Sequence, residues 1–164
     1  KNTMPKFHLT LTVNGEQREL LIDPRRTLLD VLRNELELRG AHRGCDSGDC
    51  GACTVLLAPS PTERGKPITS CMILAADCDG MAATTVEGIT PADGLHPVQR
   101  ALVEKGGIQC GFCTPGMVMA AIALLDDNPH PTEAEVKEGL VGNLCRCTGY
   151  KKIVEAVLSV EEGK

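Results

Sequence analysis

The chain has 164 residues, enough for one domain or two small ones. Hydrophobic residues make up 42% of it and aromatic residues only 2%, so its core must be mainly aliphatic. The net charge of −5 and the isoelectric point near 5.4 argue against a nucleic-acid partner held through phosphate contacts. The sequence has no run of about 18 apolar residues, so we expect no membrane span.

Nine cysteines are the unusual feature of the composition. An odd number cannot pair completely within the chain, and the cysteines gather in tight groups, which suits metal ligation better than disulfide stapling. Clustered thiols and the lack of a visible signal peptide predict a cytoplasmic location. Because the sequence begins at Lys1 without a Met, a missing N-terminal segment and export with a partner stay open.

In the first half, hydrophobic residues alternate with polar ones from Phe7 to Val13, which predicts a strand with one buried face. Asn14-Gly15 follows, a typical hairpin turn, and residues 16–22 are the expected partner strand. Thr27 and Asp30 predict a helix N-cap, with the helix ending near Gly40. We expect further short strands at 54–57 and 82–86, separated by a Pro-rich loop at 59–67.

In the second half, the alternating pattern gives way to helical spacing. The four expected helices begin at Pro97, run from Thr114-Pro115 to Leu125, are capped by Thr132 and Glu135, and contain Ile153 and Val157. The sequence therefore predicts an α+β protein with two domains, a β-rich one over residues 1–84 and a helical one over residues 85–164.

The first cysteine group has the pattern C-x4-C-x2-C, formed by Cys45, Cys50 and Cys53. This is the run of plant-type [2Fe-2S] ferredoxins, which take a fourth cysteine further along, and Cys71 is the obvious candidate. Interleaved glycines allow the backbone to curl so that N–H groups approach sulfur. A structural zinc loop is the alternative, although such loops usually use C-x2-C pairs.

The second group combines a C-x2-C pair with a C-x-C pair about thirty residues later. Cys113 precedes one expected helix and Cys147 precedes another, so two helix N-termini would face an anionic site. The four members of the group are Cys110, Cys113, Cys145 and Cys147. From spacing alone, a zinc site remains an alternative for this group. Thioredoxin-type redox chemistry fits poorly, because its motif belongs to a strand–helix unit.

Three stretches together resemble the small iron–sulfur subunit of the molybdenum hydroxylases, the xanthine dehydrogenase and carbon monoxide dehydrogenase family. They are GCDSGDCGACTV at residues 44–55, GIQCGFCTPGMVMA at 107–120 and GNLCRCTGYKKIVEAV at 142–157. With TSC ending at Cys71 and TVEGIT at 85–90, the resemblance covers nearly the whole chain.

The resemblance implies a β-grasp plant-type ferredoxin domain followed by a four-helix domain, each with one [2Fe-2S] cluster. The implied ligands of the first cluster are Cys45, Cys50, Cys53 and Cys71, and those of the second are Cys110, Cys113, Cys145 and Cys147. Gln109 would contact the pterin of a molybdenum cofactor on a large subunit. Electrons would pass from there through the second cluster, then the first, to FAD on a medium subunit, with a dimer of heterotrimers as the expected assembly.

The chain departs from the family pattern at two places. Residues 58–66 form a longer segment than usual before the fourth ligand, and Cys78 matches no ligand position, so we expect a loop and a free thiol respectively. Three rival functions stay open: a zinc-stabilised interaction module, a stand-alone ferredoxin-like carrier, and reductive use of the same relay. The sequence does not identify the substrate, because the large subunit would select it.

Overall fold

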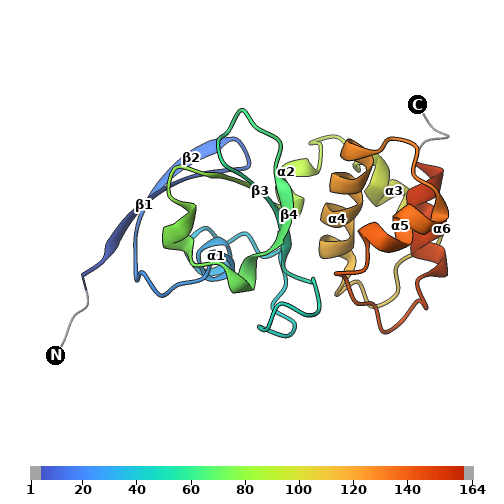
Figure 1. Cartoon of the computed structure of the whole chain (residues 1–164), viewed down its shortest axis with the longest axis horizontal. Coiled ribbons are helices and arrows are strands. Elements are labelled where there is room, and N and C mark those ends of the chain that lie inside the picture. Colours follow the sequence, from blue (N-terminus) through green and yellow to red (C-terminus); the bar gives the residue numbers. More distant parts are fainter. Residues whose placement is uncertain (1–4, 161–164) are drawn as a thin grey trace.

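In the computed structural model, which describes residues 5–160, a β-rich half and a helical half lie side by side (Figure 1). The outer ends of the two expected domains, residues 1–4 and 161–164, lie outside the described residues. The β-rich half contains one five-stranded sheet with the strand order β2-β1-β5-β3-β4. Its strands are β1 (Phe7–Val13), β2 (Glu16–Ile22), β3 (Thr54–Ala58), β4 (Lys66–Thr69) and β5 (Ala82–Thr84).

The predicted hairpin is confirmed. β1 and β2 pair antiparallel, with Phe7 opposite Ile22 and Val13 opposite Glu16. Asn14 and Gly15 both have positive φ, at 52° and 83°, which the tight turn between right-twisted strands requires. Asn14 also reaches across the fold, because its side-chain oxygen accepts from the Thr85 amide at 2.8 Å. Because the Thr85 amide bonds to Asn14, it is not available to continue the sheet. Strand β5 therefore ends at Thr84, two residues before the expected end at Val86.

The first helix begins as predicted but is shorter. Thr27 and Asp30 form a reciprocal capping box at the start of α1 (Leu28–Asp30), which continues as a π-helical turn, η1 (Val31–Glu35). The helix ends before Gly40 because Glu37 takes a left-handed φ of 57° and the Leu38 amide turns back to donate to the Leu32 carbonyl. This reversal packs Leu38 against the core of the β-rich half.

The expected loop at 59–67 contains the start of an unpredicted strand. β4 pairs antiparallel with β3, with Pro67 opposite Leu56. Proline is tolerated here because β4 is an edge strand of the sheet. Arg64, in the longer-than-usual segment, donates to Asp127 at 2.8 Å, so this loop is held against the end of a helix of the other half.

The helical half confirms the four expected helices, although one runs slightly further than predicted. They are α3 (Pro97–Glu104), α4 (Thr114–Asp127), α5 (Glu133–Gly139) and α6 (Lys151–Ser159), preceded by the short α2 (Val86–Ile89). Two short 3-10 turns, η2 (Ser70–Met72) and η3 (Ala75–Cys78), complete the β-rich half. Across the described residues, no helix has the length and apolar character needed to cross a membrane.

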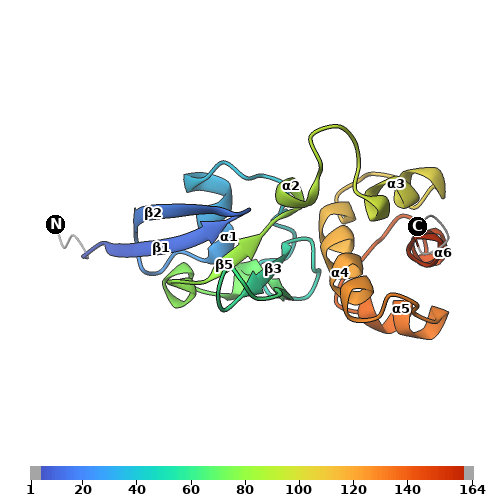
Figure 2. The ribbon, with the colours of Figure 1, turned by 90° about the horizontal axis from the view of Figure 1, so that it is seen from above.

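Two hydrophobic cores meet at β3. Val55 faces the core of the β-rich half, which includes Leu28 and Leu32, whereas the next residue, Leu56, belongs to the core of the helical half. Consecutive strand residues point to opposite faces, so one strand can serve both cores. Figure 2 shows α4 standing between β3 and the other helices. The buried Met117 and Met119 of α4 are therefore core residues.

Candidate metal centres

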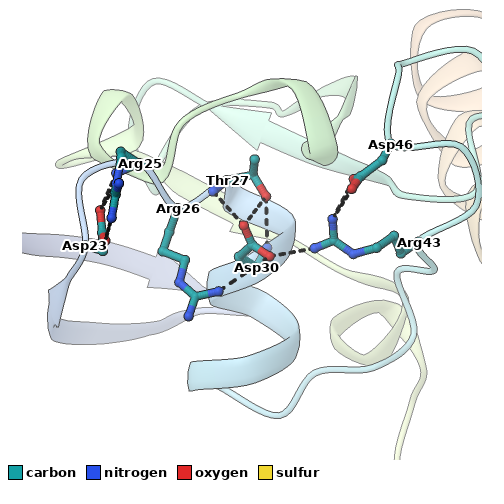
Figure 3. A network of polar contacts seen from close by, with 7 residues as sticks. All are labelled: Asp23, Arg25, Arg26, Thr27, Asp30, Arg43 and Asp46. Carbon is teal, nitrogen blue, oxygen red and sulfur yellow. Dashed lines mark hydrogen bonds and ion pairs between the residues drawn. The ribbon is translucent and has the colours of Figure 1, made fainter.

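The loop carrying Cys45 is anchored by charged side chains, which Figure 3 shows. Arg43 donates to Asp30 at 2.6 Å and to Asp46 at 2.5 Å, so one guanidinium links the cap of α1 to the residue that follows Cys45. Burial works against ionisation of Asp30, but bonds from Thr27 and the charge of Arg43 leave its pKa lowered. Asp46 has a left-handed φ of 60°, which turns the loop back.

The anchored loop directs backbone N–H groups at the Cys45 sulfur. The Ser47 amide donates to it at 3.5 Å and the Cys50 amide at 3.4 Å. Hydrogen bonds from Ser47 and Cys50 lower the pKa of this thiol to about 6, so it is readily available as a thiolate ligand. The expected approach of N–H groups to sulfur is therefore present at Cys45.

Of the other three cysteines of the first group, Cys50 and Cys53 lie on the same loop, and Cys71 comes to it from η2. Cys53 and Cys71 are buried and interact with each other, and the charge of Cys45 also acts on Cys71. Burial and the contact with Cys53 raise the pKa of Cys71 to about 11, because both disfavour the charged thiolate. The sulfur of Cys50 lies so close to Gly44 that a Cβ at Gly44 would come within 2.7 Å of it.

The second group is assembled from two distant loops, which the fold brings together as two thiol pairs. The Cys110 and Cys147 sulfurs are 3.6 Å apart, and Cys113 interacts with Cys145. Two sulfurs bound at about 2.3 Å to one tetrahedral metal ion would lie about 3.8 Å apart, so the first pair has the spacing of ligands that share an ion. Among residues 5–160, no three His, Cys, Asp or Glu side chains form a group suited to one metal ion.

The two pairs differ in exposure. Cys145 is buried and Cys113 is half-buried, whereas Cys110 and Cys147 are exposed. Burial and the Cys145 contact raise the pKa of Cys113 to about 12. Burial also opposes ionisation of Cys145, but bonds from Thr148 and the Cys147 amide leave its pKa lowered.

The expected helix N-termini are only partly present at the second group. Cys113 is the N-cap of the 14-residue helix α4, but α6 starts at Lys151, so Cys147 does not adjoin it. Instead, residues 148–150 fold back over Cys145. The Thr148 hydroxyl lies 3.1 Å from the Cys145 sulfur, and the Cys145 amide donates to the Tyr150 hydroxyl at 3.0 Å.

Three contacts that the sequence did not predict lie between the two groups. His42 stacks on Phe112 with ring centroids 4.8 Å apart. The Leu144 amide donates to the Cys50 carbonyl at 2.9 Å, and the buried Asn143 donates to the Gly51 carbonyl at the same distance. The two cysteine groups are thus joined through neighbouring backbone. The motif resemblance marks residues 142–157, but the partner of Asn143 is visible only in the fold.

Two further residues singled out in the sequence, Gln109 and Cys78, lie in very different surroundings. Gln109 is exposed and adjoins the exposed Cys110, so its position at the surface suits a contact with another chain. Cys78 is fully buried, and burial raises the pKa of its thiol to about 11. It lies in the core of the β-rich half.

Comparison with known proteins agrees with this arrangement. Residues 11–76 match the 2Fe-2S iron-sulfur cluster binding domain family, and residues 85–158 match the [2Fe-2S] binding domain family. The chain is 44% identical to the nicotinate dehydrogenase small FeS subunit of Eubacterium barkeri, over 94% of both chains. It is 48% identical to the nicotine 6-hydroxylase small subunit of Paenarthrobacter nicotinovorans, over 93% of this chain and 88% of that one.

The chain is a small iron–sulfur subunit of the molybdenum hydroxylase family. A solved structure of quinoline 2-oxidoreductase from Pseudomonas putida 86 matches the fold of this subunit with a TM-score of 0.88 and 36% identity, over 98% of this chain and 99% of that one. The subunit carries two [2Fe-2S] domains, β-grasp ferredoxin and four-helix, and transfers electrons within a multi-subunit oxidoreductase. In the members of this family that are built from separate subunits, the molybdenum cofactor and FAD belong to other, large and medium, subunits.

Proposed function

We propose that the iron–sulfur subunit holds one [2Fe-2S] cluster on each cysteine group, with all eight grouped cysteines as ligands and Cys78 outside both sites. The first cluster would bind Cys45, Cys50, Cys53 and Cys71, and the second Cys110, Cys113, Cys145 and Cys147. The observation that carries the proposal is the pairing of the second group, with the sulfurs of Cys110 and Cys147 3.6 Å apart although 37 residues separate them. Two pairs are what a cluster of two irons needs.

We further propose that electrons enter at the second cluster and leave from the first. Gln109 and the exposed Cys110 and Cys147 form an edge at which the large subunit would bring its pterin close. The clusters, when bound, would each carry one electron at a time. The residues of this chain hold them, direct N–H groups at sulfur and exclude water, and none of them performs bond chemistry on a substrate.

We propose that substrate choice lies outside this chain, because similar small subunits belong to complexes named for different substrates. Its relatives include subunits named for nicotinate and nicotine and one named for aldehydes. Substrate choice would therefore fall to the large subunit. We propose a dimer of heterotrimers as the assembly, a domain division at residues 84 and 85, and a cytoplasmic location, which suits nine thiols.

Metal analysis of the purified complex tests the ligand assignment. Each copy of this chain should bring four irons and four acid-labile sulfides, two of each for each [2Fe-2S] domain. Cys145→Ser should lose half of this iron, and Cys78→Ala, the matched control, should keep all of it. A colourless chain that contains zinc would overturn the proposal.

A further inference from the structure

The two cysteine groups meet through a small buried contact that the relay as described does not use. The backbone carbonyl of Gly51, in the loop between Cys50 and Cys53, accepts from three donors. They are the Asn143 side-chain amide at 2.9 Å, the Thr54 hydroxyl at 2.7 Å and the Thr54 amide at 3.1 Å. Such a carbonyl has little freedom to move.

Asn143 makes this contact from the other cysteine group. It lies two residues before Cys145, is only 5% exposed, and also reaches the Thr54 hydroxyl at 3.3 Å. A buried side-chain amide whose partners were removed would lose its hydrogen bonds without gaining water. Its orientation is therefore strongly determined, although its main partner is 92 residues away in the sequence.

The backbones approach each other closely at the same point. A Cβ at Gly116, in the first turn of α4, would come within 2.1 Å of the Gly51 carbonyl oxygen, and a Cβ at Gly51 would come within 2.2 Å of the Gly142 oxygen. Both glycines are thus needed for the loops to touch. Next to them, the Leu144 amide donates to the Cys50 carbonyl at 2.9 Å.

We infer that Asn143 is a positioning residue for electron transfer between the two clusters. Asn143 fixes the Gly51 carbonyl, and this holds the neighbouring Cys50 carbonyl against the Leu144 amide. A single hydrogen bond then joins the backbone of Cys50, in the first group, to the residue next to Cys145, in the second. The inference rests on the proposed ligands. The electron passes singly from the reduced second cluster to the oxidised first cluster, and no proton or bond is exchanged.

The test compares three variants in the intact complex. Asn143→Ala removes the side-chain amide and both of its hydrogen bonds. Thr54→Val removes only the Thr54 hydroxyl, which is the more distant partner of the Asn143 amide and also a donor to the Gly51 carbonyl. Asn14→Gly is the matched control, because Asn14 also joins distant segments, through Thr85, but touches neither cysteine group. Glycine accepts the positive φ of Asn14, so the control loses the side-chain bonds without backbone strain.

Two readouts separate positioning from simple stabilisation: the magnetic splitting between the two reduced clusters, and the rate at which the first cluster is reduced after the second. We expect Asn143→Ala to change the splitting and slow this rate at least tenfold, Thr54→Val to do so by a smaller factor, and Asn14→Gly to change neither while lowering the unfolding temperature. If Asn143→Ala does not fold, Thr54→Val decides alone.

Wild-type splitting and rate in a folded Asn143→Ala protein, or in Thr54→Val where it decides alone, would overturn the inference. Failure of the proposed function would look different. In that case the wild-type chain itself would lack two [2Fe-2S] signals, whatever the variants did.

Discussion

The chain brings four cysteines together at each of the two sites, but it does so in different ways. The first lies mostly on one loop, which a local network of Arg43, Asp30 and Asp46 and left-handed turns shape around Cys45. The second has no such loop. Its pairs come from segments more than thirty residues apart, and only the packing of α3 to α6 brings Cys110 to Cys147 and Cys113 to Cys145.

The first site depends chiefly on local chain geometry, and the second depends on tertiary packing. We therefore expect damage to the helical core to spread to the second cluster, and damage to the Arg43 network to stay near the first. The contact between Asn143 and Gly51 is where this independence ends, since it ties the local loop to the packed helices.

Loss of a ligand should have the largest effect at either site. Cys113→Ser should remove the second cluster and Cys45→Ser the first, and each should lower turnover of the complex by more than about 100-fold, because a metal ligand matters at least as much as its outer partners. The two variants differ in rapid-mixing EPR. Substrate should still reduce the remaining cluster in Cys45→Ser but not in Cys113→Ser.

That contrast tests the order of transfer. Rapid reduction of the first cluster by substrate in Cys113→Ser, at the wild-type rate, would show that electrons do not need to pass through the second.

Gly116→Ala tests how far the two sites share one contact. The new methyl group would meet the Gly51 carbonyl, which is backbone and cannot move aside, so we expect a loss of about 1–3 kcal/mol in the free energy of unfolding. Gly139→Ala is the control, because its methyl group would meet only the flexible end of Leu124 at 3.0 Å. Chemical denaturation measures both, and equal effects would contradict the importance of this approach.

Gln109→Ala separates the outer edge of the second site from its ligands. Because Gln109 is exposed and next to Cys110, its removal should slow electron entry by about 10-fold, the low end for residues around a metal site, and leave both clusters visible by EPR. The half-buried Gln99 on α3 offers a comparison, since its bonds are to His96 and Thr90 and not to a grouped cysteine. Unchanged reduction of the second cluster by substrate in Gln109→Ala would count against the proposed contact with the pterin.

The smallest expected effect is that of replacing Cys78, which lies outside both proposed cluster sites. Burial raises the pKa of this thiol to about 11 from an ordinary value near 9, so the folded chain keeps its proton between these values while the unfolded chain loses it. The contribution of Cys78 to stability is therefore fully present below pH 9 and is lost as the pH rises toward 11. Cys78→Ala should remove this part of the alkaline loss, which unfolding measured at pH 8 and pH 10 would reveal.

Much of the arrangement could be predicted from the sequence, because its signals are local. Alternation gave β1, Asn14-Gly15 the hairpin, and the capping pairs at Thr27 and Thr132 two helix starts. The cysteine spacing pointed to the first site. The misses involve distant partners: β4 was hidden by Pro67, which only an edge strand accepts, and the first helix ends early because Leu38 returns to the core.

The contact of Asn143 could not be predicted for the same physical reason. Nothing in the residues next to Asn143 shows that its amide will meet Gly51, since the meeting requires both halves to be folded and packed. The pairing within the second group is also a product of packing, although the resemblance to a known family implied that these four cysteines belong together.

Spin counting by EPR on the fully reduced complex tests most directly whether this chain holds two clusters on eight cysteines. Two distinct [2Fe-2S] signals that integrate to two spins for each copy of this chain, with Cys113→Ser retaining only one signal and one spin, are the expected result. A wild-type chain with a single spin, or a Cys113→Ser chain that keeps both signals, would contradict the assignment.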